Sequence, residues 1–362
     1  MKEKISGIQT VAIVYNTIVP TAILVVPNIV ISHSRQDAWI SILGALILAL
    51  GFAVLTGAIV RNNPGMSFPV WISKRFGKIA GLVGGLLLAQ YYISISAVIL
   101  QEFINILSDQ ILLKTPNIVL MSLILIVSAY AVHSGIEVIA RVNGVVTVIT
   151  MLAYCISFFL FVNLIDFHLL APVMNNSLSK ISFGGLLPLG WMSESAIILV
   201  LMPYLKDTAK AGKYAVYGTV LAGLHLTITV VLCIAVFGPD LPQQFRYPSF
   251  SMIEVIRIGA TLERIDILFV SFWLCTIYVK MSLFLFGAYH CLTETLQMKP
   301  SKPLLFALSM LVLLTTVTSF QSETSFDMQS QHVTPYELLT INLLLPAVIW
   351  IGLQLKKIPK LK

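Results

Sequence analysis

Glu194 and Lys280 are the two residues whose type and position point most directly to chemistry. Thirteen residues without Asp, Glu, Lys or Arg lie on each side of Lys280, and Glu194 has thirteen such residues before it and eleven after it. A charge at the centre of a bilayer costs about 2.5–3.5 kcal/mol on insertion scales, so each side chain should face the protein interior and find a partner. The two are therefore predicted to pair with each other.

Such a pair has several uses. It can be a structural ion pair that fixes two helices against each other. Alternatively, Glu194 holds the ammonium group of a ligand and Lys280 its carboxylate, or Glu194 is a site of proton binding. A fixed cation at Lys280 also disfavours a bound sodium ion nearby, because like charges repel strongly where the dielectric constant is low.

The composition shows what must position these residues. Of the 362 residues, 57% are hydrophobic and only 11% are charged, too few charged side chains to cover a soluble protein of this size. A helix needs ~20 apolar residues to cross the hydrocarbon core. The sequence thus predicts an all-α, polytopic membrane protein that lies in the lipid bilayer. Ten spans are expected near residues 5–34, 38–60, 79–101, 116–132, 142–164, 185–205, 214–237, 265–291, 303–321 and 335–355.

The loop charges predict the orientation. Placing the N-terminus in the cytoplasm puts 16 lysines and arginines on the inner side and 6 on the outer side. Cytoplasmic loops carry the excess of positive charge, so both termini are predicted to be cytoplasmic. This bias accounts for the net charge of +7 without nucleic acid as a partner. The first apolar stretch is expected to be a retained helix and not a cleaved signal peptide.

Helix breakers suggest an internal repeat. The first expected helix contains Pro20 and Pro27, and the sixth contains Pro188, Gly190 and Pro203. These are the first helices of two five-helix halves, and an odd number of helices per half gives the halves opposite orientations. We expect one domain, residues 1–362, with repeats at about 5–164 and 185–355. Helices 1 and 6 are predicted to be broken and to expose backbone groups to a substrate at the midplane.

The other polar and aromatic residues of the apolar spans have ordinary structural roles as well as functional ones open to them. Glu102 is expected to snorkel at a helix end, and His225 to be a neutral, hydrogen-bonded imidazole. Tyr91 and Trp191 can line a pocket or simply pack. Four scattered cysteines and six isolated histidines predict no disulfide, metal or cofactor site. The chain has no GxSxG, HExxH or P-loop motif, so we do not expect an enzyme.

Short motifs along almost the whole chain resemble those of the B subunits of spore germinant receptors. These proteins are the spore permease branch of the amino acid–polyamine–organocation transporters. The motifs, in order, are Gln9, Asp37-Ala38-Trp39-Ile40-Ser41, Pro64, Phe76-Gly77-Lys78, Thr115-Pro116, Tyr130, Gly135-Ile136-Glu137, Arg141, Phe237-Gly238, Pro248-Ser249-Phe250, Leu262-Glu263-Arg264-Ile265-Asp266 and Trp273.

The resemblance implies a LeuT-like fold of ten helices with an inverted five-plus-five repeat. It also implies a nutrient-sensing role in the spore inner membrane, in a complex with A and C subunits. A small-molecule germinant, favoured to be an amino acid over a nucleoside or sugar, is expected between helices 1, 3, 6 and 8. The implied ligand-binding residues are Val19, Pro20, Thr21, Tyr91, Ile95, Trp191, Glu194, Thr276 and Lys280.

This chain departs from the resemblance at the expected break of helix 1. Where relatives often have glycines, it has Val19-Pro20-Thr21-Ala22. Two other functions fit the same sequence: a proton-coupled amino acid permease that uses Glu194 or His225, and a channel for water or ions. The channel requires a continuous polar lining, for which the sequence offers only sparse residues such as Thr17, Ser94, Ser193 and Thr276.

Overall fold

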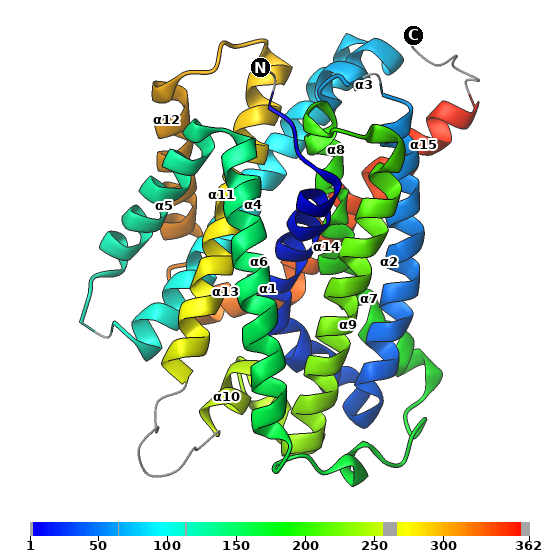
Figure 1. Cartoon of the computed structure of the whole chain (residues 1–362), viewed down its shortest axis with the longest axis vertical. Coiled ribbons are helices and arrows are strands. Elements are labelled where there is room, and N and C mark those ends of the chain that lie inside the picture. Colours follow the sequence, from blue (N-terminus) through cyan, green and yellow to red (C-terminus); the bar gives the residue numbers. More distant parts are fainter. Residues whose placement is uncertain (1–2, 64, 113, 256–265, 356–362) are drawn as a thin grey trace.

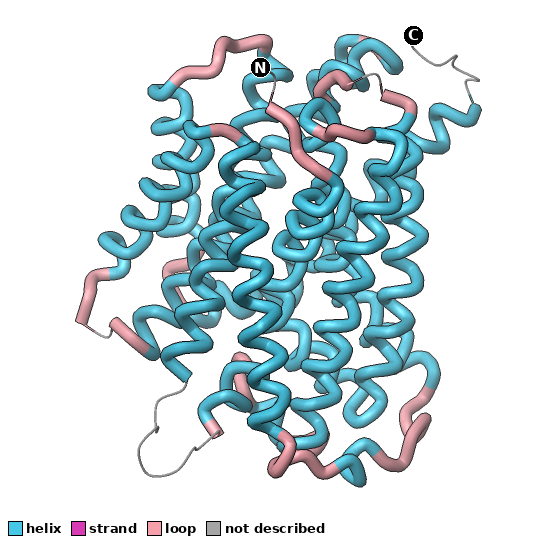
Figure 2. The backbone as a smooth tube through the Cα atoms, viewed as in Figure 1, coloured by secondary structure: helices cyan, strands magenta, loops and turns pink. Residues whose placement is uncertain are grey.

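The computed structural model describes residues 3–63, 65–112, 114–255 and 266–355, and over these ranges the chain forms a helical bundle (Figure 2). The only extended pairing found within them is one isolated bridge between Ile5 and Leu205. The helices are α1 (Gly7–Ser34), α2 (Ala38–Arg61), α3 (Phe68–Phe76), α4 (Lys78–Gln110), α5 (Asn117–Ser134), α6 (Ile136–Phe161), α7 (Leu178–Met192), α8 (Ile198–Leu201), α9 (Ala211–Phe237), α10 (Pro248–Glu254), α11 (Asp266–Leu296), α12 (Lys302–Ser319), α13 (Glu323–Met328), α14 (Thr334–Leu339) and α15 (Leu345–Leu355).

Ten membrane crossings follow from the helix lengths. Nine stretches of the described residues are long and apolar enough to span a bilayer, and the first of them, Gly7–Arg61, has 55 residues. At 1.5 Å per residue it is about 80 Å long, far more than the ~30 Å of hydrocarbon. It divides into α1 and α2 at a short 3-10 turn, Arg35–Asp37, so it crosses twice.

Several helices are longer than the sequence predicts. The third span extends to Gln110, the fifth begins at Ile136 instead of 142, the sixth at Leu178 instead of 185, and the tenth at Glu323 instead of 335. The added turns contain polar residues that an apolar window excludes. At the start of α6, for example, Glu137 and Arg141 form an ion pair across one helical turn (2.6 Å).

The two ends of the bundle differ (Figure 1). The first described residues, α3 and the end of α15 lie at one end, here called the terminal end. The helix α10 lies at the other, here called the α10 end, and α1 runs through the middle of the bundle. The short helices that follow α2 and α9 thus lie at opposite ends, as an inverted repeat predicts.

Some residues that support the sequence predictions lie outside the described ranges. They are Lys2, Arg257, Arg264, Lys356, Lys357, Lys360 and Lys362 of the charge count, and Pro64 and Leu262–Ile265 of the motifs.

Helix α1 differs from the predicted broken helix, because it continues as one α-helix through Pro20 and Pro27. A proline has no N–H, so Pro27 leaves the carbonyl of Ile23, four residues earlier, without its helical donor. The hydroxyl of Ser249 on α10 donates to that carbonyl at 2.6 Å. The lost hydrogen bond is thus replaced from another helix, and the helix need not open.

A second contact attaches the same segment to α1. The amide of Asn28 donates to the backbone carbonyls of Pro242, Gln243 and Phe245, at 3.3, 3.2 and 2.7 Å. These carbonyls belong to the turn that precedes α10. The segment 242–254, which includes α10 and is here called the α10 segment, is therefore fixed to the last three turns of α1.

The sixth span is interrupted, as predicted. Helix α7 contains Pro188 and ends at Met192, a 3-10 segment covers Ser193–Ile197, and α8 is only four residues long. The hydroxyl of Ser193 caps the break by donating to the Gly190 carbonyl at 2.5 Å. Glu194 lies in this non-α segment, which is the irregular backbone that transporter-like folds place around a site.

Helices α2 and α9 meet at two glycines. A Cβ atom added to Gly57 would collide with the backbone of Gly212. Small residues at such crossings let two membrane helices approach closely. Elsewhere on α2, a Cβ atom added to Gly44 or Gly51 would meet no neighbouring atom within 4 Å.

Candidate functional site

The centre of the candidate site is the predicted pair of buried charges. The Lys280 ammonium lies 2.9 Å from Glu194 Oε2, and both side chains are only 1% exposed. The same ammonium donates to the Thr21 hydroxyl at 2.6 Å. The structure thus brings together three predicted residues, from α1, the interrupted sixth span and α11.

The pair retains hydrogen-bonding capacity. A lysine ammonium has three donors, of which two are used by Glu194 and Thr21. The other carboxylate oxygen, Glu194 Oε1, is buried and has no partner among the described residues. The Phe284 ring lies 5.3 Å from the ammonium, a cation–π distance that stabilises the charge. One donor and one acceptor therefore remain for another molecule.

Three more predicted residues pack in the same core without touching the pair through a hydrogen bond. Tyr91 on α4 stacks obliquely on Phe284 at 6.2 Å between ring centroids, and its hydroxyl accepts from Asn342 at 2.8 Å. Ile95 and Trp191 are buried in the common hydrophobic core. Tyr91 thus packs on the same Phe284 ring that lies beside the Lys280 ammonium.

The remaining predicted residues lead to a separate space. Val19, Pro20 and Thr276 line a cavity of about 130 Å³ between α1, α6, α9, α10 and α11. Neither Glu194 nor Lys280 is among its lining residues. The nine predicted residues therefore fall into three groups of three: those of the charged pair and Thr21, those of the hydrophobic core, and those of a neighbouring uncharged cavity.

Two further sequence expectations are resolved. His225 Nδ1 lies 2.6 Å from the Tyr15 hydroxyl, which confirms a hydrogen-bonded imidazole. Glu102 does not snorkel: it is only 1% exposed, because the long helix α4 continues for two turns beyond it. Its Oε2 atom has no partner among the described residues.

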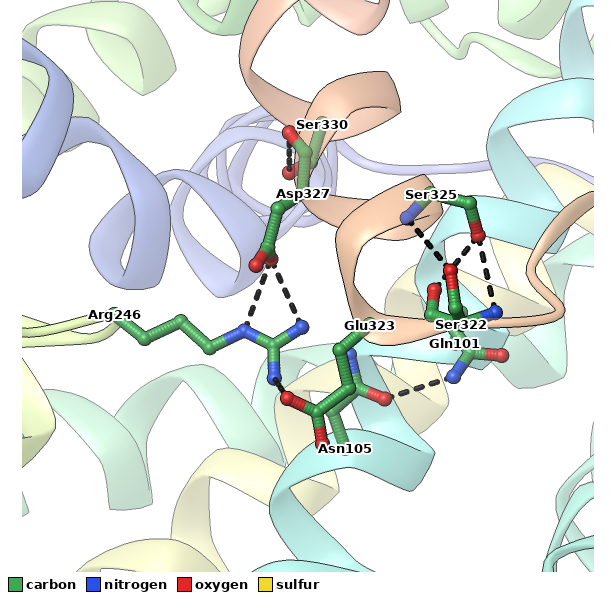
Figure 3. A network of polar contacts seen from close by, with 8 residues as sticks. All are labelled: Gln101, Asn105, Arg246, Ser322, Glu323, Ser325, Asp327 and Ser330. Atoms are coloured by element: carbon green, nitrogen blue, oxygen red, sulfur yellow. Dashed lines mark hydrogen bonds and ion pairs between the residues drawn. The ribbon is translucent and has the colours of Figure 1, made fainter.

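A network of charges connects the α10 segment to the tenth span (Figure 3). Arg246 precedes α10 and forms ion pairs with Asp327 (2.9 Å) and Glu323 (3.4 Å) of α13. Its guanidinium also lies 5.7 Å from the Phe326 ring. Burial opposes the charge, but Tyr247 and Asp327 outweigh it and raise the pKa of Arg246 above its usual value. The cation is therefore permanent and holds the α10 segment against α13.

Replacing Arg246 by alanine is expected to lower the melting temperature of the purified protein by several degrees. The change leaves Asp327 without its charged partner in a half-buried position, where charge-assisted hydrogen bonds contribute about 1.5–3 kcal/mol. Arg35→Ala is the matched control, because its ion pair with Asp240 is 47% and 69% exposed and exposed pairs contribute little. Equal melting temperatures for the two variants would contradict the role assigned to the network.

The residues that sequence reasoning missed carry weaker signals. Phe284 lies four residues after Lys280, one helical turn away, so its cation–π contact could be anticipated. Ser249 is part of a motif, but its partner follows from the missing N–H of Pro27 only once the fold is known. Arg246 has no local signal, because its partners lie more than 75 residues later in the chain.

The chain is similar in sequence to proteins of spore germination. Residues 4–325 match the family described as "Spore germination protein". The chain is similar to spore germination protein KB of Bacillus subtilis (strain 168), with 25% identity over 93% of this chain and 91% of the relative. It is also similar to spore germination protein XB of Bacillus anthracis, with 25% identity over 92% of this chain and 94% of the relative.

Solved structures share the fold. Mhp1, a nucleobase-cation-symport-1 family transporter in a closed conformation with bromovinylhydantoin bound, has a TM-score of 0.62 at 14% identity and covers 96% of this chain and 78% of its own. MhsT in complex with L-phenylalanine has a TM-score of 0.55 at 13% identity, over 98% and 99% of the two chains. The fold is thus that of transporters with inverted repeats, and by the match over most of its length the chain belongs to the spore germination protein family.

Proposed function

We propose that this protein is the nutrient-sensing subunit of a spore germinant receptor, and that it binds an amino acid at the Glu194–Lys280 pair. The observation that carries the proposal is the buried ion pair with one free acceptor, Glu194 Oε1, at the interruption of the sixth span. The family match to spore germination proteins supports the sensing role. The transporter fold supports a small-molecule ligand at the midplane.

The pair suits a zwitterion. The ammonium group of an amino acid can bind the free oxygen of Glu194, and its carboxylate can take the third donor of Lys280. Tyr91 and Trp191 would then contact the ligand side chain. Because Lys280 also holds Thr21 of α1, ligand binding changes the contact between α1 and the sixth span.

Signalling then requires two conformations with different ligand affinities. We propose that the interrupted sixth span moves relative to α1, and that the partner A and C subunits respond to this change in the spore inner membrane. The experiment that tests sensing is germination of spores that lack the gene, on a panel of single amino acids, nucleosides and sugars. Loss of response to one amino acid, with its uptake unchanged, supports the proposal; unchanged germination contradicts it.

A proton-coupled amino acid permease is the second candidate. The similarity in fold to Mhp1 and MhsT favours it, and Glu194 would carry the proton. A permease moves labelled amino acid into liposomes without partner subunits, whereas a receptor needs its partners and gives no net uptake.

We also propose the orientation that the charges predict, with the terminal end in the cytoplasm. In a background with Cys155 and Cys275 changed to serine, Lys114→Cys should react with an impermeant maleimide added outside the cell, because Lys114 follows α4 at the α10 end. Lys299→Cys, in the loop between α11 and α12, should react only after the membrane is permeabilised. Both residues are exposed, and the reverse pattern would overturn the orientation.

A further inference from the structure

The cavity next to the charged pair has an apolar lining that includes several aromatic rings. Its described lining residues include no Asp, Glu, Lys or Arg. Tyr154, Phe161, Phe250, Phe272 and Trp273 are among them. A zwitterion or an ion would lose its hydration here without gaining a charged partner, which costs several kcal/mol. The occupant must therefore be uncharged.

The polar atoms of the lining are mostly donors already in use. The hydroxyls of Thr150, Ser157 and Thr229 donate to carbonyls of the helices that carry them, at 2.9, 2.7 and 2.9 Å. The Trp273 indole N–H donates to the Pro20 carbonyl at 2.8 Å. The oxygen atoms of the three hydroxyls still have lone pairs that can accept a hydrogen bond.

Two polar atoms on lining residues have no partner among the described residues. Asn16 Oδ1 is an acceptor that is left over after the Asn16 amide N–H₂ has bonded Asn143 and Thr147. His225 Nε2 is also unpartnered, while Nδ1 is engaged by Tyr15. Buried polar atoms normally have partners. The unpaired oxygen of Asn16 and the free lone pairs of the hydroxyls favour an occupant that brings a hydrogen-bond donor, whereas His225 Nε2 donates or accepts according to which ring nitrogen carries the proton.

The enclosed volume of the cavity suits an occupant of about one ring. A cavity of roughly 150 Å³ in another protein holds benzene, and this one has about 130 Å³. We propose that the cavity binds an uncharged aromatic molecule of one ring, with one hydroxyl or ring N–H donor. The site is distinct from the charged pair, and the proposal does not depend on the germinant-sensing role.

Such a ligand would act on the α10 segment. The cavity is lined by Ile23 of α1 and by Ser249 of α10, the two residues joined by the hydrogen bond at the Pro27 position. An occupant touches α1, α10 and α11 together and stabilises the arrangement in which they pack. We therefore expect it to modulate the protein without competing for Glu194 and Lys280.

The test is binding of 4-fluorophenol to the full chain in lipid nanodiscs, followed by ¹⁹F NMR, with empty nanodiscs to subtract partition into lipid. Saturable binding is expected for 4-fluorophenol. Binding of 4-fluoroanisole, which lacks the O–H donor, should be about fivefold to tenfold weaker, the effect of one hydrogen bond. Benzylammonium and benzoate should not displace the probe.

Two neighbouring substitutions on α6 localise the site. Ala153 is buried and lines the cavity, so Ala153→Phe fills it and should abolish saturable binding. Leu152 is exposed on the adjacent surface, so Leu152→Phe should leave binding unchanged. Should Ala153→Phe fail to fold, the smaller change Ala153→Leu serves the same purpose, with a severalfold weaker affinity expected.

Several results would overturn the proposal. Equal binding by wild type and the folded Ala153 variant places the probe elsewhere. Equal binding of fluoroanisole removes the donor requirement. Displacement by benzylammonium assigns the probe to the charged pair, and displacement by 1-hexanol at the same concentration as by phenol makes the cavity a site for lipid acyl chains.

Discussion

Replacement of Lys280 by methionine is expected to cause the largest loss of stability of any single conservative change in the charged pair. Methionine matches the length of the lysine stem but leaves Glu194 as a buried carboxylate without a cation. Removing one partner of a buried ion pair costs about 3–5 kcal/mol. Abundance in the membrane should fall severalfold, which an immunoblot of spore membranes measures.

The double variant Lys280→Met with Glu194→Gln separates stability from sensing. It removes both charges, and such replacements are often neutral for folding. Abundance should therefore recover, while the germination response stays absent, because neither end of a zwitterion is recognised. Recovery of both abundance and response would show that the pair serves only to hold the helices, and would contradict the proposed ligand site.

The charge swap Glu194→Lys with Lys280→Glu adds a test of polarity. Restored abundance without a germination response would mean that ligand recognition depends on which helix carries the acid and which carries the lysine. The exposed pair of Lys210 and Asp207 supplies the control, since Lys210→Met removes an ion pair that solvent screens and should change neither abundance nor response.

The second large effect is expected at the helix crossing of α2 and α9. Gly57→Val places a branched side chain where Gly212 already contacts the helix, so the two helices must move apart. Overpacking of this kind costs about 1–3 kcal/mol or more, and here it affects a crossing that holds α9 and its His225 beside α1. A lower melting temperature and loss of monodisperse protein in detergent are the expected results.

Gly51→Val on the same helix is the matched control. It has the same side-chain change and the same helix propensity, but the position is open and exposed. Its melting temperature should equal that of the wild type or exceed it slightly, because replacing glycine in a helix reduces chain entropy in the unfolded state. Equal destabilisation by both variants would show that propensity, and not the crossing, is responsible.

The sequence was sufficient for the parts of the fold that depend on single-residue properties. Apolar length predicts each span, and the cost of isolated charge predicts that Glu194 and Lys280 pair. The effect of proline could not be decided in this way. Pro188 lies near a true interruption, whereas Pro27 does not interrupt α1, because Ser249, far later in the chain, replaces the missing donor.

The division of the site could not be predicted either. Val19 and Thr21 are two residues apart, about 200° around the helix, so one lines the cavity and the other meets Lys280. The neighbour that each face of α1 meets depends on how the helices pack. For the same reason the sequence placed Glu102 near solvent, whereas it is buried in the folded chain.

The attachment of α10 to α1 limits how the molecule can rearrange. Pulling α10 away would strip the Ile23 carbonyl of its replacement donor and would release the three carbonyls held by Asn28. In a low-dielectric environment each such loss is expensive. Helix α1 and the α10 segment should thus move together as one rigid body. We expect the hinge for any opening to lie in the sixth span, where the backbone is already not a regular α-helix.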